Sequence, residues 1–324
     1  LDIEHNYIIR IFSSLSSWIQ KSFWTERGMA YSFNVFFPSV VYRCQSPESI
    51  TELYDKTALF AKGILLNTNV EMRKLILDSG DSTLLNKYNT LSANQSIYKK
   101  LIEKPKKERF VDADSLYDVI QNQEMELARE SKAYGDFAHN LRITAKDVQQ
   151  KLKKGDIAIE FLDFPLYGTD SLMYVALTLK SDYESPHMIT LFEKKELDSI
   201  LTTNYYNDSR LYDLIWKPLE AELTDVYDIY FSPSGQLHHI GIEYLPTASQ
   251  EYICDKHNLH RLSSTRQLAV NGDEAKGEKA VLYGGLDYEK NGYKTQKQES
   301  ADKDEDRFVY VYRSDVDSLA LRGT

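Results

Sequence analysis

One stretch constrains the fold more than any other part of the chain: residues 228–246, with the sequence DIYFSPSGQLHHIGIEYLP. Its residues 229–231 are β-branched or aromatic, which favours a buried strand. A Ser-Pro-Ser-Gly turn follows, in which proline presets one backbone dihedral and Gly235 is free to adopt a positive φ. An apolar run then resumes. The pattern predicts a β-hairpin, in which His238 and His239 would point to opposite faces of the second strand.

Upstream of this stretch, the spacing of apolar residues changes at Gly155 from a helical period to a strand-like alternation. Three strands separated by polar turns are predicted at residues 156–162, 173–179 and 188–192. They are expected to form an antiparallel meander. Two short helices are predicted next, at residues 195–201 and 210–223, and Pro218 is expected to interrupt the second.

Residues 1–150 have the spacing of antiparallel helices, and they are predicted to form a helical, TPR-like regulatory domain. Helix starts are indicated by Ser46 before a proline, by Asp114, and by Thr144 followed three residues later by Asp147. Other helices are predicted at residues 8–19, 70–77 and 84–102. No 34-residue repeat stands out, so a plain structural helical domain stays open as an alternative.

Composition narrows the function classes. The chain has 324 residues, enough for about two domains, and its net charge of −10 argues against a general nucleic-acid binder, which needs a basic surface. No stretch is long and apolar enough to predict a membrane span. Cys44 and Cys254 lie far apart and without metal-type spacing, which predicts two reduced, buried thiols and a cytoplasmic protein. No cofactor and no metal site are expected.

Three segments in this order resemble the CHAT domain, a caspase-like family of cysteine peptidases of clan CD that often follows TPR-type helices. The first is the strand with its Pro-x-Gly-x-Leu turn and the run ending in Glu-x-Leu, at residues 228–246. The second, residues 261–268, is similar to the family's strand that leads into a short helix. The third, AVLYGGLDY at residues 280–288, is similar to the first strand of the caspase-like sheet.

This resemblance covers residues 150–324 and implies an α+β or α/β architecture. Residues 1–150 would be the regulatory helices, and residues 151–324 would be the N-terminal portion of a CHAT domain with an antiparallel accessory sheet. The resemblance also implies a catalytic pair, a His followed by Gly and a later Cys, beyond the third segment. The sequence has no His-Gly pair and no cysteine after Cys254, so no catalytic residue is assigned to it.

The chain is therefore expected to be inactive alone and to belong to a larger endopeptidase, a hydrolase that cleaves peptide bonds with its Cys–His pair. Its expected partners are the C-terminal catalytic half of the same protein and a protein activator or substrate on the helices. A non-catalytic scaffold with a degenerate CHAT domain, or a helical adaptor joined to an unrelated α/β domain, stays open. The substrate, the cleavage preference, the activator and the oligomeric state are not indicated by the sequence.

A few side chains are weaker site candidates. Arg266 would line a substrate pocket, by analogy with basic pockets in related peptidases, or form an ion pair near a helix terminus. Cys254 and His257 have a Cys-x-x-His spacing that could seed a zinc site, but two further ligands would be needed. No oxyanion hole or orienting group supports a Cys–His pair here, so the histidines, including His260, are interpreted as structural.

The last residues suggest a regulatory cut. Residues 289–307 are almost wholly polar and predict a long exposed loop, after which residues 308–312 could return as an edge strand. Either the chain is truncated, or a caspase-like zymogen is matured by proteolysis within residues 289–324, with Arg322 as a possible cleavage site.

Overall fold

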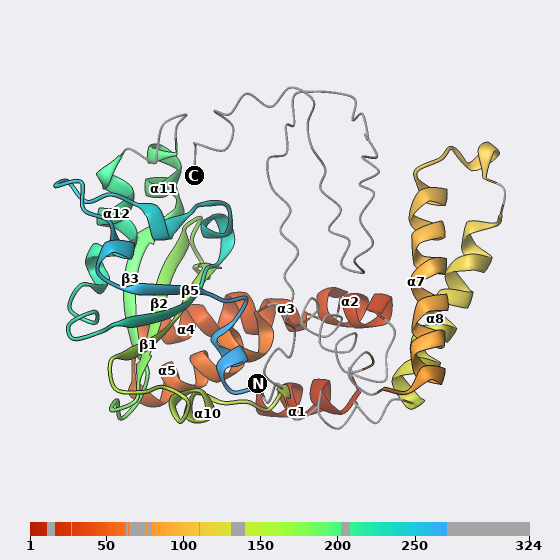
Figure 1. Cartoon of the computed structure of the whole chain (residues 1–324), viewed down its shortest axis with the longest axis horizontal. Helices are drawn as coiled ribbons and strands as arrows, with labels where there is room; N and C mark the ends of the chain where they lie inside the picture. Colours follow the sequence, from red (N-terminus) through yellow and green to blue (C-terminus); the bar gives the residue numbers. More distant parts are fainter. Residues whose placement is uncertain are drawn as a thin grey trace, which may run out of the picture. The chain divides into compact units, whose positions relative to one another are not determined.

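The computed structural model describes residues 1–11, 17–26, 28–62, 64, 76, 80–109, 111–130, 140–201 and 208–270. These residues form an α+β structure with a five-stranded mixed sheet, as the sequence predicts at this coarse level (Figure 1). Residues 1–271 make up one compact unit. A division into domains near residue 150 stays a prediction.

The sheet has the strand order β3-β2-β1-β4-β5. The predicted antiparallel meander is confirmed: β1 (Asp156–Pro165) pairs with β2 (Leu172–Lys180), and β2 pairs with β3 (His187–Glu193). The remaining two strands, β4 (Asp228–Ser232) and β5 (Asn258–Arg261), run parallel to β1. The sheet therefore joins an antiparallel half to a parallel half at β1.

The predicted β-hairpin at residues 228–246 is wrong. Its first strand exists as β4, but the second half forms two short 3-10 turns, η7 (Gly235–His239) and η8 (Ile242–Tyr244). The reason is that β4 pairs on one side with β1 and on the other with β5, which leaves no edge for a hairpin partner. The expected opposite orientation of His238 and His239 is wrong as well, because both lie exposed in η7.

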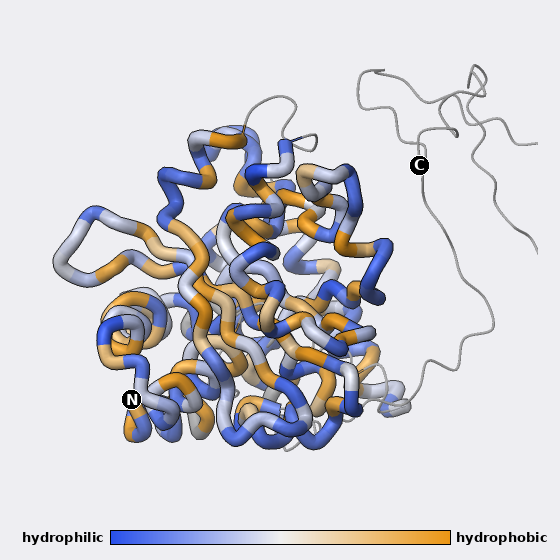
Figure 2. The backbone as a smooth tube through the Cα atoms, turned by 90° about the vertical axis from the view of Figure 1, so that its left-hand side faces the viewer, coloured by the Kyte–Doolittle hydropathy of each residue, from blue (hydrophilic) through white to orange (hydrophobic). Residues whose placement is uncertain are grey.

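The two faces of the sheet bury different helices. Ile157, Ile159 and Phe161 of β1 belong to one hydrophobic cluster, together with side chains of α11 (Lys194–Ile200) and α12 (Ser209–Ile215). Ala158 and Leu162 of β1 belong to a second cluster on the other face, with side chains of α4 (Phe37–Cys44), α5 (Pro47–Leu53) and α10 (Ala145–Gln149). Figure 2 shows hydrophobic residues concentrated along the strands. This burial on both faces follows from the alternation of side chains along a strand.

The short helices of the second half are close to their predicted places. Residues 195–201 correspond to α11, and residues 210–223 correspond to α12 followed by the 3-10 helix η6 (Lys217–Leu219), so Pro218 does interrupt the helix. After the 3-10 turn η9 (Ile253–Asp255), β5 ends at Arg261 and η10 (Thr265–Leu268) follows. The predicted strands at residues 280–288 and 308–312, the loop 289–307 and Arg322 lie outside the described residues.

Most of the first 150 residues are helical where the structure describes them. The elements are α1 (Asp2–Ile11), α2 (Ser17–Glu26), α3 (Met29–Tyr31), the π-helix η2 (Ser32–Phe36), α4, α5, the π-helix η3 (Tyr54–Ala61), α7 (Ser82–Ile102), the 3-10 helix η4 (Lys106–Glu108), α8 (Ala113–Glu130) and α10. Of the predicted helix at residues 70–77, only residue 76 is described, in a helical conformation. No described helix is long and apolar enough to span a membrane.

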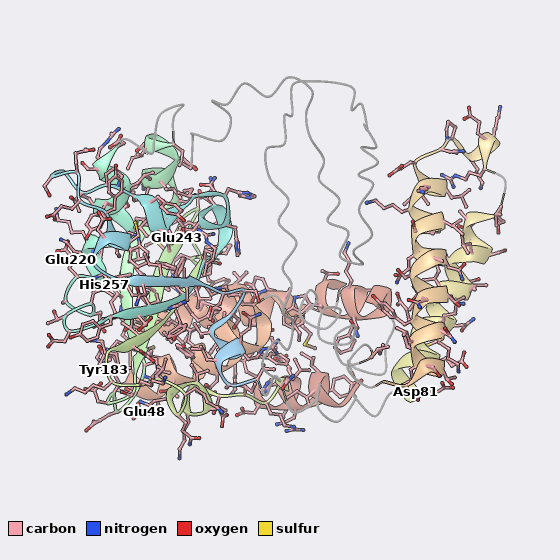
Figure 3. All side chains as sticks on the ribbon, in the orientation of Figure 1. Glu48, Asp81, Tyr183, Glu220, Glu243 and His257 are labelled. Carbon is pink, nitrogen blue, oxygen red and sulfur yellow. The ribbon has the colours of Figure 1, made fainter. Side chains whose placement is uncertain are left out.

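The side chains that cap the helix N-termini can be compared directly with the caps predicted from the sequence. Ser46 accepts a hydrogen bond from the backbone N of Ser49, and the Thr144–Asp147 capping box is present, so both predictions are confirmed. The predicted cap at Asp114 is wrong, because Asp112 accepts from the backbone N of Ser115 at 3.0 Å and begins α8. A cap that was not predicted, Asp81, begins α7 (Figure 3).

Candidate functional site

The candidate site is built around one carboxylate in the middle of the sheet. Glu160 lies in β1 between Ala158 and Leu162, and all three side chains face the helical layer of α4 and α5. The Glu160 side chain is 0% exposed. A carboxylate in such a place is stable only when it is paired and hydrogen-bonded, because burial removes its hydration.

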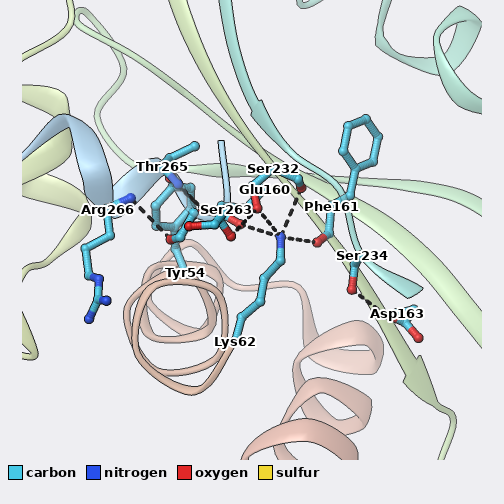
Figure 4. Close-up of polar contacts among 11 residues, drawn as sticks. Tyr54, Lys62, Glu160, Phe161, Asp163, Ser232, Ser234, Ser263, Thr265 and Arg266 are labelled. Carbon is cyan, nitrogen blue, oxygen red and sulfur yellow. Dashed lines mark hydrogen bonds and ion pairs between the residues drawn. The ribbon is translucent and has the colours of Figure 1, made fainter. Parts of the chain in front are cut away.

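Lys62 supplies the opposite charge from the helical half of the chain. This residue directly follows η3, and its ammonium Nζ lies 2.7 Å from Oε2 of Glu160 (Figure 4). The same nitrogen donates to the carbonyl O of Phe161 at 3.0 Å and contacts the carbonyl O and Oγ of Ser232 at 2.9 and 2.7 Å. One ammonium therefore bridges the middle of β1 and the end of the neighbouring parallel strand β4.

The second oxygen of Glu160 binds the segment after β5. Oε1 accepts hydrogen bonds from Oγ of Ser264 at 3.0 Å, from the backbone N of Thr265 at 2.5 Å and from Oγ1 of Thr265 at 2.9 Å. Oγ1 of Thr265 also lies 2.9 Å from the hydroxyl of Tyr54 in η3. We call Tyr54, Lys62, Glu160, Ser232, Ser264 and Thr265 the buried junction.

Burial controls the electrostatics of the buried junction. Loss of hydration lowers the pKa of Lys62, and the attraction of Glu160 opposes this effect without cancelling it. Burial, followed by the nearby negative charge of Glu160, raises the pKa of the Tyr54 hydroxyl. Both oxygens of Glu160 and the nitrogen of Lys62 are occupied by protein partners, so the junction joins four segments of the chain and presents no free base or nucleophile.

A second set of contacts fixes the Ser-Pro-Ser-Gly turn after β4. Oγ of Ser234 donates to Oδ1 of Asp163 in β1, and the backbone N of Gln236 donates to the hydroxyl of Tyr174 at 3.1 Å. Gly235 has a φ of 52°, and a Cβ there would lie 2.5 Å from the Tyr174 hydroxyl. Burial raises the pKa of Tyr174 to about 12, so its hydroxyl stays protonated at neutral pH. The turn is therefore held against the sheet at a glycine that no other residue replaces without strain.

Arg266, the proposed substrate-pocket residue, lies in η10 directly after the buried junction. It is 2% exposed, and its Nη1 donates to the backbone carbonyl of Asn140 at 3.5 Å. The structure thus places Arg266 inside the protein next to Thr265. Its role in substrate binding stays a prediction.

The cysteines and histidines do not assemble into a site within the described residues. Cys44 and Cys254 are both free, as predicted, but both are exposed, so the prediction of buried thiols is wrong. Nδ1 of His257 lies 2.9 Å from the backbone carbonyl of Val226, and Nε2 of His260 lies 2.9 Å from Oδ1 of Asp228. No group of three or more His, Cys, Asp or Glu side chains that could hold a metal ion occurs in the described part of the chain.

The sequence reasoning missed both charged members of the buried junction. A signal was present: Glu160 is the only charged residue between Ile157 and Leu162, inside a strand that is apolar on both sides. Such a carboxylate demands a buried donor. The identity of the donor carried no local signal, because Lys62 is 98 positions away.

A scan of the chain against protein-family models and a search of the curated proteins find no match.

Proposed function

We propose that this chain is the regulatory, N-terminal part of a CHAT-type, caspase-like cysteine endopeptidase of the cytoplasm. The parent protein would hydrolyse peptide bonds with a Cys–His pair that lies C-terminal to this chain. Alone, the chain would be inactive. Its task is to receive a protein activator or substrate on the helices and to position the catalytic half.

The observation that supports this proposal most is that the buried junction connects the helical half of the chain with the segment after β5. Lys62 comes from the helical half, Glu160 from the central strand, and Thr265 from the segment that leads toward residues 280–288, the third segment with CHAT-like sequence. A displacement of η3 by a bound partner changes the hydrogen bonds of Glu160 and, through them, the position of residues 263–268. A signal on the helices thereby reaches the downstream part of the protein.

The resemblance adds a step of maturation. In this proposal, a cut within residues 289–324, with Arg322 as the candidate cleavage site, activates the parent enzyme while its halves stay associated. Intact-mass analysis of the full-length protein before and after activation tests this step. A fully active enzyme that remains one uncut chain would contradict it.

The proposed activity is tested by comparing residues 1–324 with the full-length gene product. We expect hydrolysis of a fluorogenic peptide library and labelling by a thiol-directed inhibitor only in the full-length protein, at one cysteine beyond Thr324. Replacing that cysteine with alanine should abolish both signals. Full-length protein that lacks the His-Gly and later Cys, or that shows neither signal with any activator, would favour the non-catalytic scaffold instead.

A further inference from the structure

The buried junction offers no group to an outside substrate, but its two charged members are placed to react with each other. The side chains of Lys62 and Glu160 are 11% and 0% exposed, and Nζ lies 2.7 Å from Oε2. Two groups held in contact and well oriented react as if their concentration were about 10⁵ M or more. The condensation product of an amine and a carboxyl group is an amide, formed with loss of water.

The two oxygens of the Glu160 carboxylate have different surroundings. Oε1 accepts three hydrogen bonds, from the backbone N and Oγ1 of Thr265 and from Oγ of Ser264, at 2.5–3.0 Å. Among the described residues, the hydrogen bond to Oε2 comes from Lys62 alone. When an amine attacks a carboxyl group, donors are needed at the oxygen that becomes negative, while the other oxygen leaves. Oε1 has the surroundings of the first oxygen, and Oε2 has those of the second.

Lys62 has the environment of an activated amine. Burial lowers the pKa of its ammonium, because the attraction of Glu160 offsets the loss of hydration only in part. Desolvation of this kind is one of the ways in which proteins make a lysine nucleophilic. Transfer of one ammonium proton to Oε2 converts the ion pair into an amine and a carboxylic acid, and burial favours these neutral forms. The amine then has a lone pair available for the carboxyl carbon.

We propose that Lys62 and Glu160 form an intramolecular amide cross-link after the protein has folded. Nζ forms a bond to the carboxyl carbon Cδ, and the charge that develops on Oε1 is held by the donors of Ser264 and Thr265. The Cδ–Oε2 bond then breaks. Of the three ammonium protons, two leave with Oε2 as water and one stays on the amide nitrogen, so no other reagent is consumed.

The surroundings accommodate the products as well as the reactants. The remaining N–H can donate to the carbonyl O of Phe161 or of Ser232, which already accept from Nζ at 3.0 and 2.9 Å. A cavity of about 370 Å³ that Lys62 helps to line has room for the released water. Oε1 keeps its donors as the amide oxygen, so the connection from η3 to residues 263–268 is preserved. The inference does not depend on the proposed peptidase function.

The test is mass spectrometry of the purified 324-residue chain. Under denaturing conditions we expect a species lighter than the sequence mass by one water molecule, and its fraction should rise while the folded protein is incubated at neutral pH. Tryptic digestion should yield one joined peptide that contains both Lys62 and Glu160. Protein that keeps its full mass after prolonged incubation, or a loss of water that maps to other residues, would overturn the proposal.

Variants tie the loss of water to this pair. Lys62→Arg keeps the positive charge, but its guanidinium stays protonated and forms no amide, so the joined peptide should disappear. Lys217→Met removes a lysine from an exposed ion pair with Asp213 and should leave the cross-link unchanged. Thr265→Val removes one donor to Oε1 and should slow the reaction about a hundredfold. An unchanged rate in Thr265→Val, or loss of water in Lys62→Arg, would contradict the mechanism, and the wild-type measurement decides by itself if a variant does not fold.

Discussion

Replacing Lys62 with methionine tests the buried junction most directly. The substitution keeps most of the side-chain volume but removes the ammonium that bridges Glu160, Phe161 and Ser232. Oε2 of Glu160 then remains as a buried, uncompensated charge. Removing one partner of a buried ion pair costs about 3–5 kcal/mol, a large fraction of the 5–15 kcal/mol by which a typical domain is stable.

The coupling energy between Lys62 and Glu160 is measured by a double-mutant cycle that combines Lys62→Met with Glu160→Gln. The glutamine can still accept the hydrogen bonds of Ser264 and Thr265, but it leaves the Lys62 ammonium without a counter-charge. We expect each single variant to lose about 3–5 kcal/mol in the free energy of unfolding. The double variant should lose about as much as one single variant, because it contains no unpaired charge, which makes the coupling energy about 3–5 kcal/mol.

Urea denaturation followed by circular dichroism measures these free energies. Lys217→Met is the matched control, because Lys217 pairs with Asp213 at 3.0 Å on the exposed surface of α12 and η6, where an ion pair contributes little. Hydrogen exchange adds a local readout: the Thr265 amide, which donates to Glu160, should exchange faster in Lys62→Met. Single variants that stay within about 1 kcal/mol of the wild type, or strictly additive losses, would refute the reasoning.

Three further changes test local environments. Burial raises the pKa of Asp55 to about 6, so the wild type loses stability as the pH rises through 6. Asp55→Asn should therefore be more stable than the wild type by up to about 3 kcal/mol at pH 7, measured by urea denaturation. Burial lowers the pKa of His5 from 6.5 to about 4, so stability should fall as the pH drops through this range, and melting curves of His5→Phe should show a smaller loss. Gly235→Ala should cost about 1–3 kcal/mol, measured by urea denaturation, because of its positive φ and the Tyr174 hydroxyl.

Each of these three predictions has a result that would contradict it. For Asp55→Asn, the gain in the free energy of unfolding over the wild type should vanish near pH 4. A gain that does not depend on pH would mean that the variant is stabilised by better packing and not by loss of the buried charge. For His5→Phe, an acid loss equal to that of the wild type would show that His5 is not responsible. For Gly235→Ala, adding Tyr174→Phe removes the hydroxyl that meets the new Cβ, and no recovery at all would exclude this contact as the cause.

The elements that follow from local chemistry were predictable from the sequence. The three antiparallel strands agree with the alternation of apolar residues, and the helix starts at Ser46 and Thr144 agree with the capping chemistry of short polar side chains. In each case the decisive neighbours are within a few positions. The wrong cap at Asp114 shows the limit of this reasoning, because Asp112, two positions away, has the same chemistry and a better position.

The errors concern features that distant parts of the chain decide. The stretch after β4 has the composition of a strand, but it cannot pair with β4, because β1 and β5 already occupy both edges of β4. It forms 3-10 turns instead. Cys44, the last residue of α4, and Cys254, in the middle of η9, are both exposed, which no local pattern of the sequence reveals.

By itself, the sequence determined the secondary structure around the meander, and it placed in the apolar strand β1 a carboxylate that had to be paired. Only the tertiary structure decided that Lys62, among 39 basic residues, is the partner of Glu160, and that Thr265, from the segment after β5, completes the hydrogen bonds of the pair. The physical reason is that a buried charge requires a partner of opposite sign but does not specify where along the chain that partner lies.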